Sequence, residues 1–158
     1  MIYIVWRIEK AKHLAAAKSG EGARLSGGRW TSPGSRVIYC AQHLSLAILE
    51  VLVHAPDPSQ RLVARVRFRI RLHSGFVEYV RDRQLPSNFS PRTPYDVTRT
   101  IGDEWLQRAG TPVLSVPSAI VPVERNFILN PEHPRFGKLT WSTHVPISLD
   151  NRLWTMPT

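Results

Sequence analysis

The chain contains 158 residues, 42% of them hydrophobic, which suits one compact domain with its own core and leaves no room for a second domain. Its single cysteine excludes an intramolecular disulfide and a multi-cysteine metal site, and this suits a reducing compartment. The formal net charge of +9 favours a partner that carries negative charge, which can be nucleic acid, an acidic protein or a phosphorylated small molecule.

Residues 2–8, IYIVWRI, are β-branched and aromatic and predict a first strand. Charge appears early, at Arg7 and Glu9, and no small-residue cleavage pattern follows. We therefore expect no signal peptide and a cytoplasmic protein. No apolar run approaches the roughly 20 residues that a membrane-spanning helix needs.

The next segment predicts a loop between two regular elements. Residues 9–17 are compatible with a helix, and the glycines at positions 20, 22, 27 and 28 predict a loop that ends at Arg29. A turn at residues 33–34, Pro-Gly, leads into a second strand over residues 36–41.

Residues 44–54 have the length and composition of a helix, and Pro56 ends it. Glu50 is the only ionisable side chain from position 44 to position 53. A carboxylate is costly to bury unless it is paired, neutralised or used. Glu50 can therefore be a residue at the rim of the core that pairs with a nearby arginine, or a functional carboxylate on which partners converge.

Residues 61–72, RLVARVRFRIRL, predict a half-buried strand of an antiparallel or mixed sheet, because arginine and apolar residues alternate. Four arginines form a row on one face of this strand, Arg65, Arg67, Arg69 and Arg71. The row is either a solvated sheet face or a docking surface for an acidic protein segment or nucleic acid. Because no DNA-binding motif or arginine-rich tail accompanies it, we expect no direct binding of nucleic acid.

The rest of the chain predicts a loop over residues 81–95, a helix from a cap at Asp96 to about residue 109, and short strands between prolines. The predicted fold is α+β, a single compact domain with a central mixed sheet and flanking helices. The six histidines lack metal-ligand spacing, so we expect no metal. Ser118 lies outside any GxSxG motif, which excludes a hydrolase of the serine-triad type.

Three other side chains have two interpretations each. Arg29 follows two glycines and precedes Trp30, so it is either a solvated loop arginine or a clamp for phosphate. Tyr39 lies in the second predicted strand, where its ring can belong to the core or stack on a flat ligand. Arg7 ends an apolar strand beside Trp6, where solvation alone is a weaker explanation for an arginine.

The order of these motifs resembles the RES domain, which is named for its arginine, glutamate and serine. The resemblance rests on WRI near the N-terminus, GGRW before IYCA, LAILEVLVH after it, and the late segment VPSAIVPVERNFILNP. It treats residues 1–158 as a single RES domain, with a core over about residues 3–154. RES proteins are toxins of bacterial toxin–antitoxin pairs, have a fold similar to ADP-ribosyltransferases, and degrade NAD or transfer its ADP-ribose.

The resemblance implies NAD as the substrate, no required cofactor, and a cleft built from six residues. Glu50 would stabilise the oxocarbenium-like centre, while Arg29 and Arg7 would orient the pyrophosphate. Tyr39 would cover the nicotinamide ring, and Ser118 rather than Ser115 would position the nicotinamide amide or a ribose. The implied catalytic residues are Glu50, Arg29 and Tyr39, and the implied NAD-binding residues are Arg7, Arg29, Tyr39, Ser118 and Asn126.

The resemblance also implies a partner, an Xre-type DNA-binding antitoxin whose C-terminal part blocks the cleft, and hence a hetero-oligomer. The predicted function is cleavage of NAD at the bond between nicotinamide and ribose, by hydrolysis or phosphorolysis. Two alternatives remain, namely ADP-ribose transfer to a target protein and a non-enzymatic basic binding module.

Overall fold

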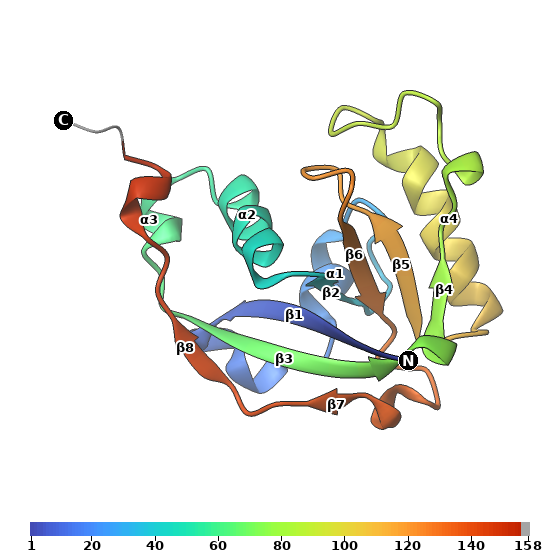
Figure 1. The fold of residues 1–158 in the computed structure, drawn as a ribbon, viewed down its shortest axis with the longest axis horizontal. Coiled ribbons are helices and arrows are strands. Elements are labelled where there is room, and N and C mark those ends of the chain that lie inside the picture. Colours follow the sequence, from blue (N-terminus) through green and yellow to red (C-terminus); the bar gives the residue numbers. More distant parts are fainter. Residues whose placement is uncertain (156–158) are drawn as a thin grey trace.

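The computed structural model of the chain describes residues 1–155, in which a curled sheet of eight strands is flanked by four α-helices (Figure 1). The elements are β1 (Ile2–Lys10), α1 (Glu21–Ser26), β2 (Ile38–Ala41), α2 (Leu44–His54), α3 (Pro58–Arg61), β3 (Arg65–His73), β4 (Val77–Tyr79), α4 (Tyr95–Arg108), β5 (Val113–Pro117), β6 (Arg125–Leu129), β7 (Thr140–Trp141) and β8 (Val145–Ile147). Short 3-10 helices cover residues 11–16, 74–76, 82–84, 136–138 and 151–153.

The sheet is mixed, with the strand order β4-β5-β6-β2-β1-β3-β7, and β8 also pairs with β3. The β4–β5 pair is parallel and the other pairs are antiparallel. β1 and β2 meet at the single pair Trp6–Ala41, so the sheet opens there, and β4 to β6 stand at a steep angle to β1 and β3 (Figure 1). The predicted α+β fold is confirmed and is consistent with an ADP-ribosyltransferase-like fold.

The two faces of the sheet have different roles. Side chains of directly paired residues share a face, so Trp6, Ala41 and Asn126 lie on the same side. On this side α2 packs through Leu46, and α4 packs through Trp105. We call it the helical face. The opposite side forms a larger apolar core that includes Val5, Cys40, Phe68, Ile70, Phe127 and Leu129.

The prediction for residues 9–17 is wrong in its first part. β1 continues to Lys10, because the pairing with β3 extends as far as Lys10 and Arg65. The helix that follows is a short 3-10 helix over residues 11–16. Sequence periodicity did not distinguish the end of the strand, because the extent of pairing depends on the position of a partner strand far along the chain.

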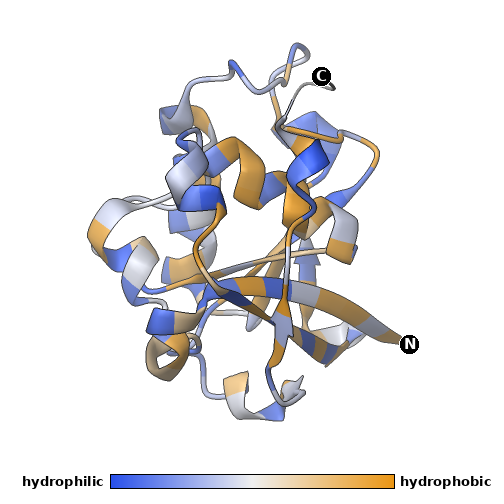
Figure 2. Cartoon of the chain, turned by 90° about the vertical axis from the view of Figure 1, so that its left-hand side faces the viewer, coloured by the Kyte–Doolittle hydropathy of each residue, from blue (hydrophilic) through white to orange (hydrophobic). Residues whose placement is uncertain are grey.

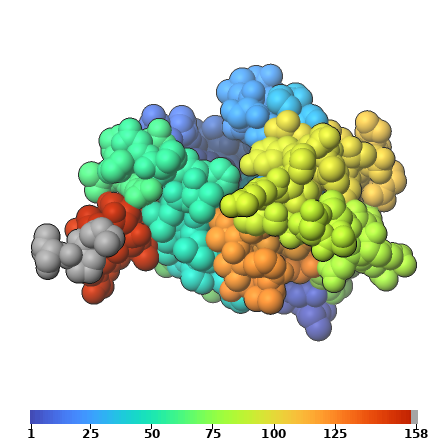
Figure 3. Space-filling model, turned by 90° about the horizontal axis from the view of Figure 1, so that it is seen from above, coloured from blue at the N-terminus to red at the C-terminus, as the bar shows by residue number. Residues whose placement is uncertain are grey.

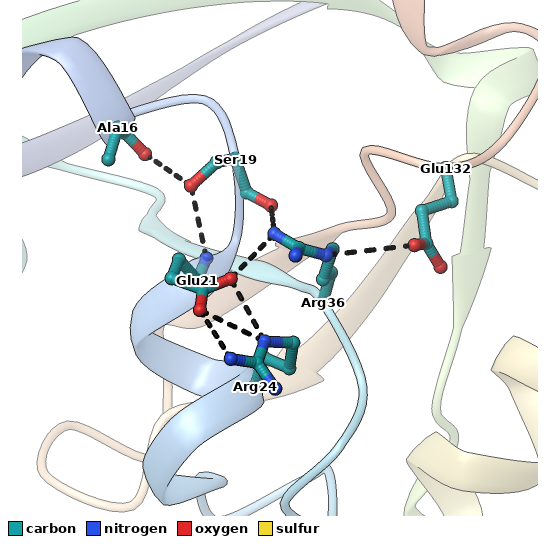
Figure 4. Close-up of polar contacts among 6 residues, drawn as sticks. All are labelled: Ala16, Ser19, Glu21, Arg24, Arg36 and Glu132. Atoms are coloured by element: carbon teal, nitrogen blue, oxygen red, sulfur yellow. Dashed lines mark hydrogen bonds and ion pairs between the residues drawn. The ribbon is translucent and has the colours of Figure 1, made fainter.

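The predicted glycine loop contains a helix, α1, which the sequence reasoning missed. Glu21 binds Arg24 through Oε1 to Nη2 at 2.5 Å and Arg36 through Oε2 to Nη1 at 2.7 Å (Figure 4). Gly20 precedes the helix with φ of +71°, a conformation that glycine adopts without strain. Arg24 and then Arg36 lower the pKa of Glu21 by hydrogen bonding and charge, so its carboxylate holds both arginines at neutral pH. A tertiary ion-pair cluster thus accompanies a helix where local composition favoured a loop.

The helix predicted over residues 44–54 is confirmed with the same bounds. The last long helix begins one residue before its predicted cap, since Pro94 occupies the N-cap position and Asp96 lies in the first turn. It ends at Arg108, and Ala109 turns the chain with φ of +46°. The arginine-rich strand begins at Arg65, because residues 58–61 form α3 instead.

Candidate functional site

The site on the helical face is built around a direct contact between α2 and β6. The amide Nδ2 of Asn126 donates a hydrogen bond to Oε1 of Glu50 at 2.6 Å. The Glu50 side chain is 27% exposed, so its carboxylate is half-buried and still open to a ligand. Its Oε2 lies 3.8 Å from Nδ1 of His54, a ring nitrogen that hydrogen-bonds to the backbone oxygen of Glu50 at 2.8 Å.

The amide oxygen of Asn126 is a hydrogen-bond acceptor that is left unsatisfied in the described structure. This atom, Oδ1, is buried and has no hydrogen-bond partner among residues 1–155. Such an atom is costly unless a ligand or water satisfies it. In the described part of the chain no arginine forms an ion pair with Glu50, so the expectation of an arginine partner at the rim of the core is wrong. The geometry instead presents two oxygen acceptors, on Glu50 and Asn126, from neighbouring side chains.

Tyr39 lies on the same face of the sheet and supports residues 27–31, the segment after α1 that we call the glycine loop. Its hydroxyl accepts a hydrogen bond from the backbone N–H of Trp30 at 3.3 Å and lies 3.0 Å from Oγ1 of Thr31. The ring lies directly beneath Gly28, where an added Cβ would overlap the tyrosine hydroxyl. Burial raises the pKa of Tyr39, so the phenol stays neutral at physiological pH. These contacts with Tyr39 therefore fix the position of the glycine loop, which carries Arg29.

Arg29 connects this loop to the segment before α4 by hydrogen bonds. Its two terminal nitrogens donate to the backbone oxygens of Thr93 at 3.1 Å and Pro91 at 2.8 Å. The guanidinium lies 4.6 Å from the centre of the Tyr95 ring, and Arg99 lies 5.3 Å from the same ring. Each terminal nitrogen of an arginine carries a second N–H, so Arg29 keeps donors for an anion. The segment 81–95, predicted as a loop, is held in place by these contacts.

Ser118 lies in the turn between β5 and β6 and is fully buried. Its Oγ accepts hydrogen bonds from the backbone N–H groups of Ile120 and Val121, both at 3.1 Å. Its own N–H donates to the backbone oxygen of Glu124 at 2.9 Å. The described structure therefore gives Ser118 a role in shaping the turn that precedes Asn126, while its contact with NAD stays a prediction.

Replacing Ser118 by alanine should lower the free energy of unfolding by about 1–3 kcal/mol, because two part-buried N–H groups lose their acceptor. Urea unfolding followed by circular dichroism measures this change. Ser148→Ala, at a position outside any helix or strand, is the matched control and should change stability by less than about 0.5 kcal/mol. Equal stability of the Ser118 variant and the wild type would contradict the structural role.

The side chain of Arg7 leaves β1 on the opposite face of the sheet from Glu50. Trp6 lies on the helical face, and successive side chains of a strand point to opposite faces. Nη1 of Arg7 donates to the backbone oxygen of Tyr39 at 3.0 Å, and Nη2 pairs with Glu9. It thus bridges β1 and β2 where the sheet opens. Its Nε is buried and has no partner within residues 1–155.

The structure therefore connects the predicted residues to different degrees. Glu50 and Asn126 are in direct contact, and Tyr39 connects their face of the sheet to the Arg29 loop. Seen from above, α2, the turn over residues 118–124, the segment before α4 and the glycine loop converge in the middle of one face (Figure 3). Arg7 does not bond to Glu50 in the described structure.

Two residues of this region were missed by the sequence reasoning, Tyr95 and Arg99. Arg99 donates from Nε to the backbone oxygen of Gly28 at 2.8 Å, while Tyr95 receives both arginines on its ring. The sequence reasoning placed Tyr95 in the loop before the predicted helix, and only the structure, in which α4 begins at Tyr95, makes Tyr95 and Arg99 neighbours at i and i+4. Within residues 1–155, no group of three or more metal-ligating side chains is placed to hold a metal ion.

Comparison with known proteins gives a consistent result. Residues 4–150 match the family model described as the RES domain. A protein named Toxin Res from Photorhabdus laumondii is 37% identical over 151 residues, covering 95% of this chain and 96% of the relative. Toxin Res of Yersinia enterocolitica is 37% identical, with coverage of 84% and 87%. A protein of a Sphingobium species named Prs ADP-ribosylating toxin is 33% identical, with coverage of 82% and 83%.

Proposed function

This chain belongs to the RES domain family, and from that premise we propose that it is a bacterial toxin that cleaves NAD at the bond between nicotinamide and ribose. The observation that supports this most directly is the Glu50–Asn126 pair. It presents a half-buried carboxylate beside a buried, unsatisfied amide oxygen. Vicinal hydroxyls of a ribose are donors that match two neighbouring acceptors.

A carboxylate at this position assists the proposed chemistry. When the bond between nicotinamide and C1′ of the ribose breaks, the electron pair of that bond leaves with neutral nicotinamide, and positive charge develops on C1′ and the ring oxygen. Glu50 stabilises that charge through space and through a hydroxyl of the ribose. Asn126 orients Glu50 through its donated hydrogen bond and offers Oδ1 to the second hydroxyl.

The arginines act on the other end of the substrate. NAD carries two phosphate charges, and a guanidinium is suited to hold a pyrophosphate through paired N–H donors. Arg29 has this role in our proposal, supported by the contacts that fix its guanidinium against Tyr95. We propose that Arg7 contributes by holding the opening between β1 and β2, and that Tyr39 keeps the glycine loop in position above the substrate.

A second candidate function is transfer of ADP-ribose to a protein, favoured by the name of the Sphingobium relative. The two functions share the step that forms the positive centre. They differ in the nucleophile that captures C1′: water loses a proton and gives ADP-ribose, phosphate gives a ribose phosphate ester, and a protein side chain gives a modified protein.

The test is release of nicotinamide from NAD by the purified protein, freed of any bound partner. We expect turnover that yields ADP-ribose in plain buffer, and a change of product when phosphate is added if phosphorolysis operates. Label transferred from adenine-labelled NAD to added protein would favour ADP-ribosylation. A folded protein that leaves NAD intact and shifts nucleic acid in a gel at moderate salt would overturn the proposal in favour of a basic binding module.

The inhibiting partner is also a proposal. We propose an Xre-type antitoxin that covers the site, so the protein should be isolated from its host as a hetero-oligomer. The part of the chain that the structure describes contains no helix of the length and apolar character needed to cross a bilayer.

A further inference from the structure

A basic row and an apolar row run side by side on the helical face, near the N-terminal end of β1. Three cross-strand pairs define them, namely Ile4–Arg71, Trp6–Arg69 and Ile8–Arg67. Ile2 and Ile4 are 51% and 45% exposed, so α2 does not cover this end of the strand. We call the set Ile2, Ile4, Trp6, Arg67, Arg69 and Arg71 the arginine–isoleucine surface. Figure 2 shows the alternation of hydrophilic and hydrophobic residues along β3.

The predicted row of four arginines is reduced to three in the structure. Arg65 is 5% exposed and lies inside the molecule rather than on a solvated face. Its guanidinium donates to the backbone oxygens of Gln60 at 2.5 Å, Arg61 at 2.9 Å and Val63 at 2.9 Å. Arg65 therefore closes the loop before β3 and takes no part in the surface.

The remaining three arginines have no acidic partner within residues 1–155. Five other arginines in this range form ion pairs with carboxylates, Arg7, Arg24, Arg36, Arg108 and Arg152. Arg69 and Arg71 are exposed, and Arg67 is half-buried with its guanidinium 5.3 Å from the centre of the Trp6 ring. The stacking fixes the direction of Arg67 and leaves its charge uncompensated.

A pocket lies where this surface meets the segment between β7 and β8. Its volume is about 330 Å³, and it is lined by Trp6, Arg67, Arg69, Ser142, Thr143 and Val145. Oγ of Ser142 accepts from the backbone N–H of Arg69 at 3.0 Å and donates to the backbone oxygen of Thr143 at 2.8 Å. These bonds hold the segment between β7 and β8 against β3, so the pocket has a fixed wall.

We propose that the arginine–isoleucine surface binds an acidic segment of a partner protein. Alternate residues of β3 are about 6.6 Å apart, which matches the spacing of alternate side chains in an extended segment. Carboxylates of such a segment pair with Arg67, Arg69 and Arg71, and one of them enters the pocket beside Trp6. Successive side chains of an extended segment point to opposite sides, so a segment that lies between the two rows directs its carboxylates to the arginine row and its apolar side chains to Ile2 and Ile4.

The apolar row decides between a protein and a nucleic acid. Phosphates could neutralise the arginines, but the exposed isoleucines would remain in water. A protein segment that alternates acidic and apolar side chains satisfies both rows, and burial of its aliphatic surface against the isoleucines adds to the affinity. This binding surface is separate from the proposed NAD chemistry and does not depend on it.

The experiment measures binding of a short fluorescein-labelled peptide of alternating glutamate and valine, by fluorescence anisotropy. Arg69→Glu/Arg71→Glu should weaken binding at least about tenfold, because two attractions become repulsions. Ile4→Ser should weaken it by about threefold or more through lost apolar contact. Lys12→Glu/Arg83→Glu makes the same change of net charge at exposed positions outside the surface and should alter affinity less than about twofold.

Three results would overturn the proposal. The first is equal weakening by the control double variant, which would show attraction by net charge alone. The second is unchanged binding when serine replaces valine in the peptide. The third is tighter binding of an oligothymidine of similar length, which would identify a nucleic-acid surface. Circular dichroism confirms that each variant is folded, and nicotinamide release by the Arg69→Glu/Arg71→Glu variant should equal that of the wild type.

Discussion

Replacing Glu50 by glutamine should lower the rate of nicotinamide release by roughly 10²–10³-fold while the protein stays folded. Glutamine has nearly the same shape and keeps an oxygen that accepts from Nδ2 of Asn126. It lacks the negative charge that faces the developing positive centre on the ribose. The loss should therefore appear in kcat, with a smaller change in KM, because the interaction is strongest in the transition state.

Glu104→Gln is the matched control for this experiment. Glu104 is an exposed glutamate on α4, and no hydrogen bond of its side chain occurs within residues 1–155. The control should retain wild-type turnover. A Glu50→Gln enzyme that keeps more than about a third of wild-type turnover would remove Glu50 from the reaction and would leave only its contact with Asn126.

Replacing Gly102 by alanine should lower the free energy of unfolding by about 3 kcal/mol. Gly102 lies in the middle of α4, and an added Cβ there would overlap the backbone oxygen of Trp30. A backbone atom cannot rotate away as a flexible side chain can, so α4 or the glycine loop must move. The melting temperature should fall by about 6–12 °C, at 2–4 °C per kcal/mol for a chain of this size.

Gly22→Ala provides the comparison within the same protein. Gly22 lies in α1 with nothing within 4 Å of an added Cβ, and its φ is not positive. Alanine there should leave stability unchanged or raise it by about 0.5–1 kcal/mol. If Gly102→Ala is as stable as Gly22→Ala, α4 does not rest on Trp30 as the structure describes. The Gly102 variant should also bind NAD more weakly, because Arg29 precedes Trp30 in the displaced loop.

Several elements were predictable because their signals are local. The helix over residues 44–54 follows from a long apolar run bounded by proline, and its bounds were predicted without error. The alternation around Phe68 and Ile70 predicted a strand with one buried face, and those side chains are 5% and 0% exposed. Motif order was sufficient to identify the RES family, which the match over residues 4–150 confirms.

The contacts of individual side chains and the ends of several elements could not be predicted, because they depend on segments far apart in the chain. Asn126 was placed beside Glu50 by pairing of β6 with β2 and packing of α2 on the same face, which no local pattern encodes. Likewise, the burial of Arg65 depends on carbonyls of the preceding loop that turn inward. Arg7 was expected to line the same cleft as Glu50 and to orient the pyrophosphate, which stays a prediction; the alternation of β1 directs its side chain to the other face of the sheet, where Glu9 pairs with it.

The sequence by itself determined the family, the α+β class, the main helix on which Glu50 lies, and the excess of positive charge. Only the tertiary structure decided which acceptor lies unsatisfied beside Glu50, which arginines remain without a carboxylate, and how the glycine loop rests on Tyr39 and α4. The physical reason is that helix and strand signals arise from neighbouring residues, whereas the state of a charge depends on every group the fold brings within a few ångströms.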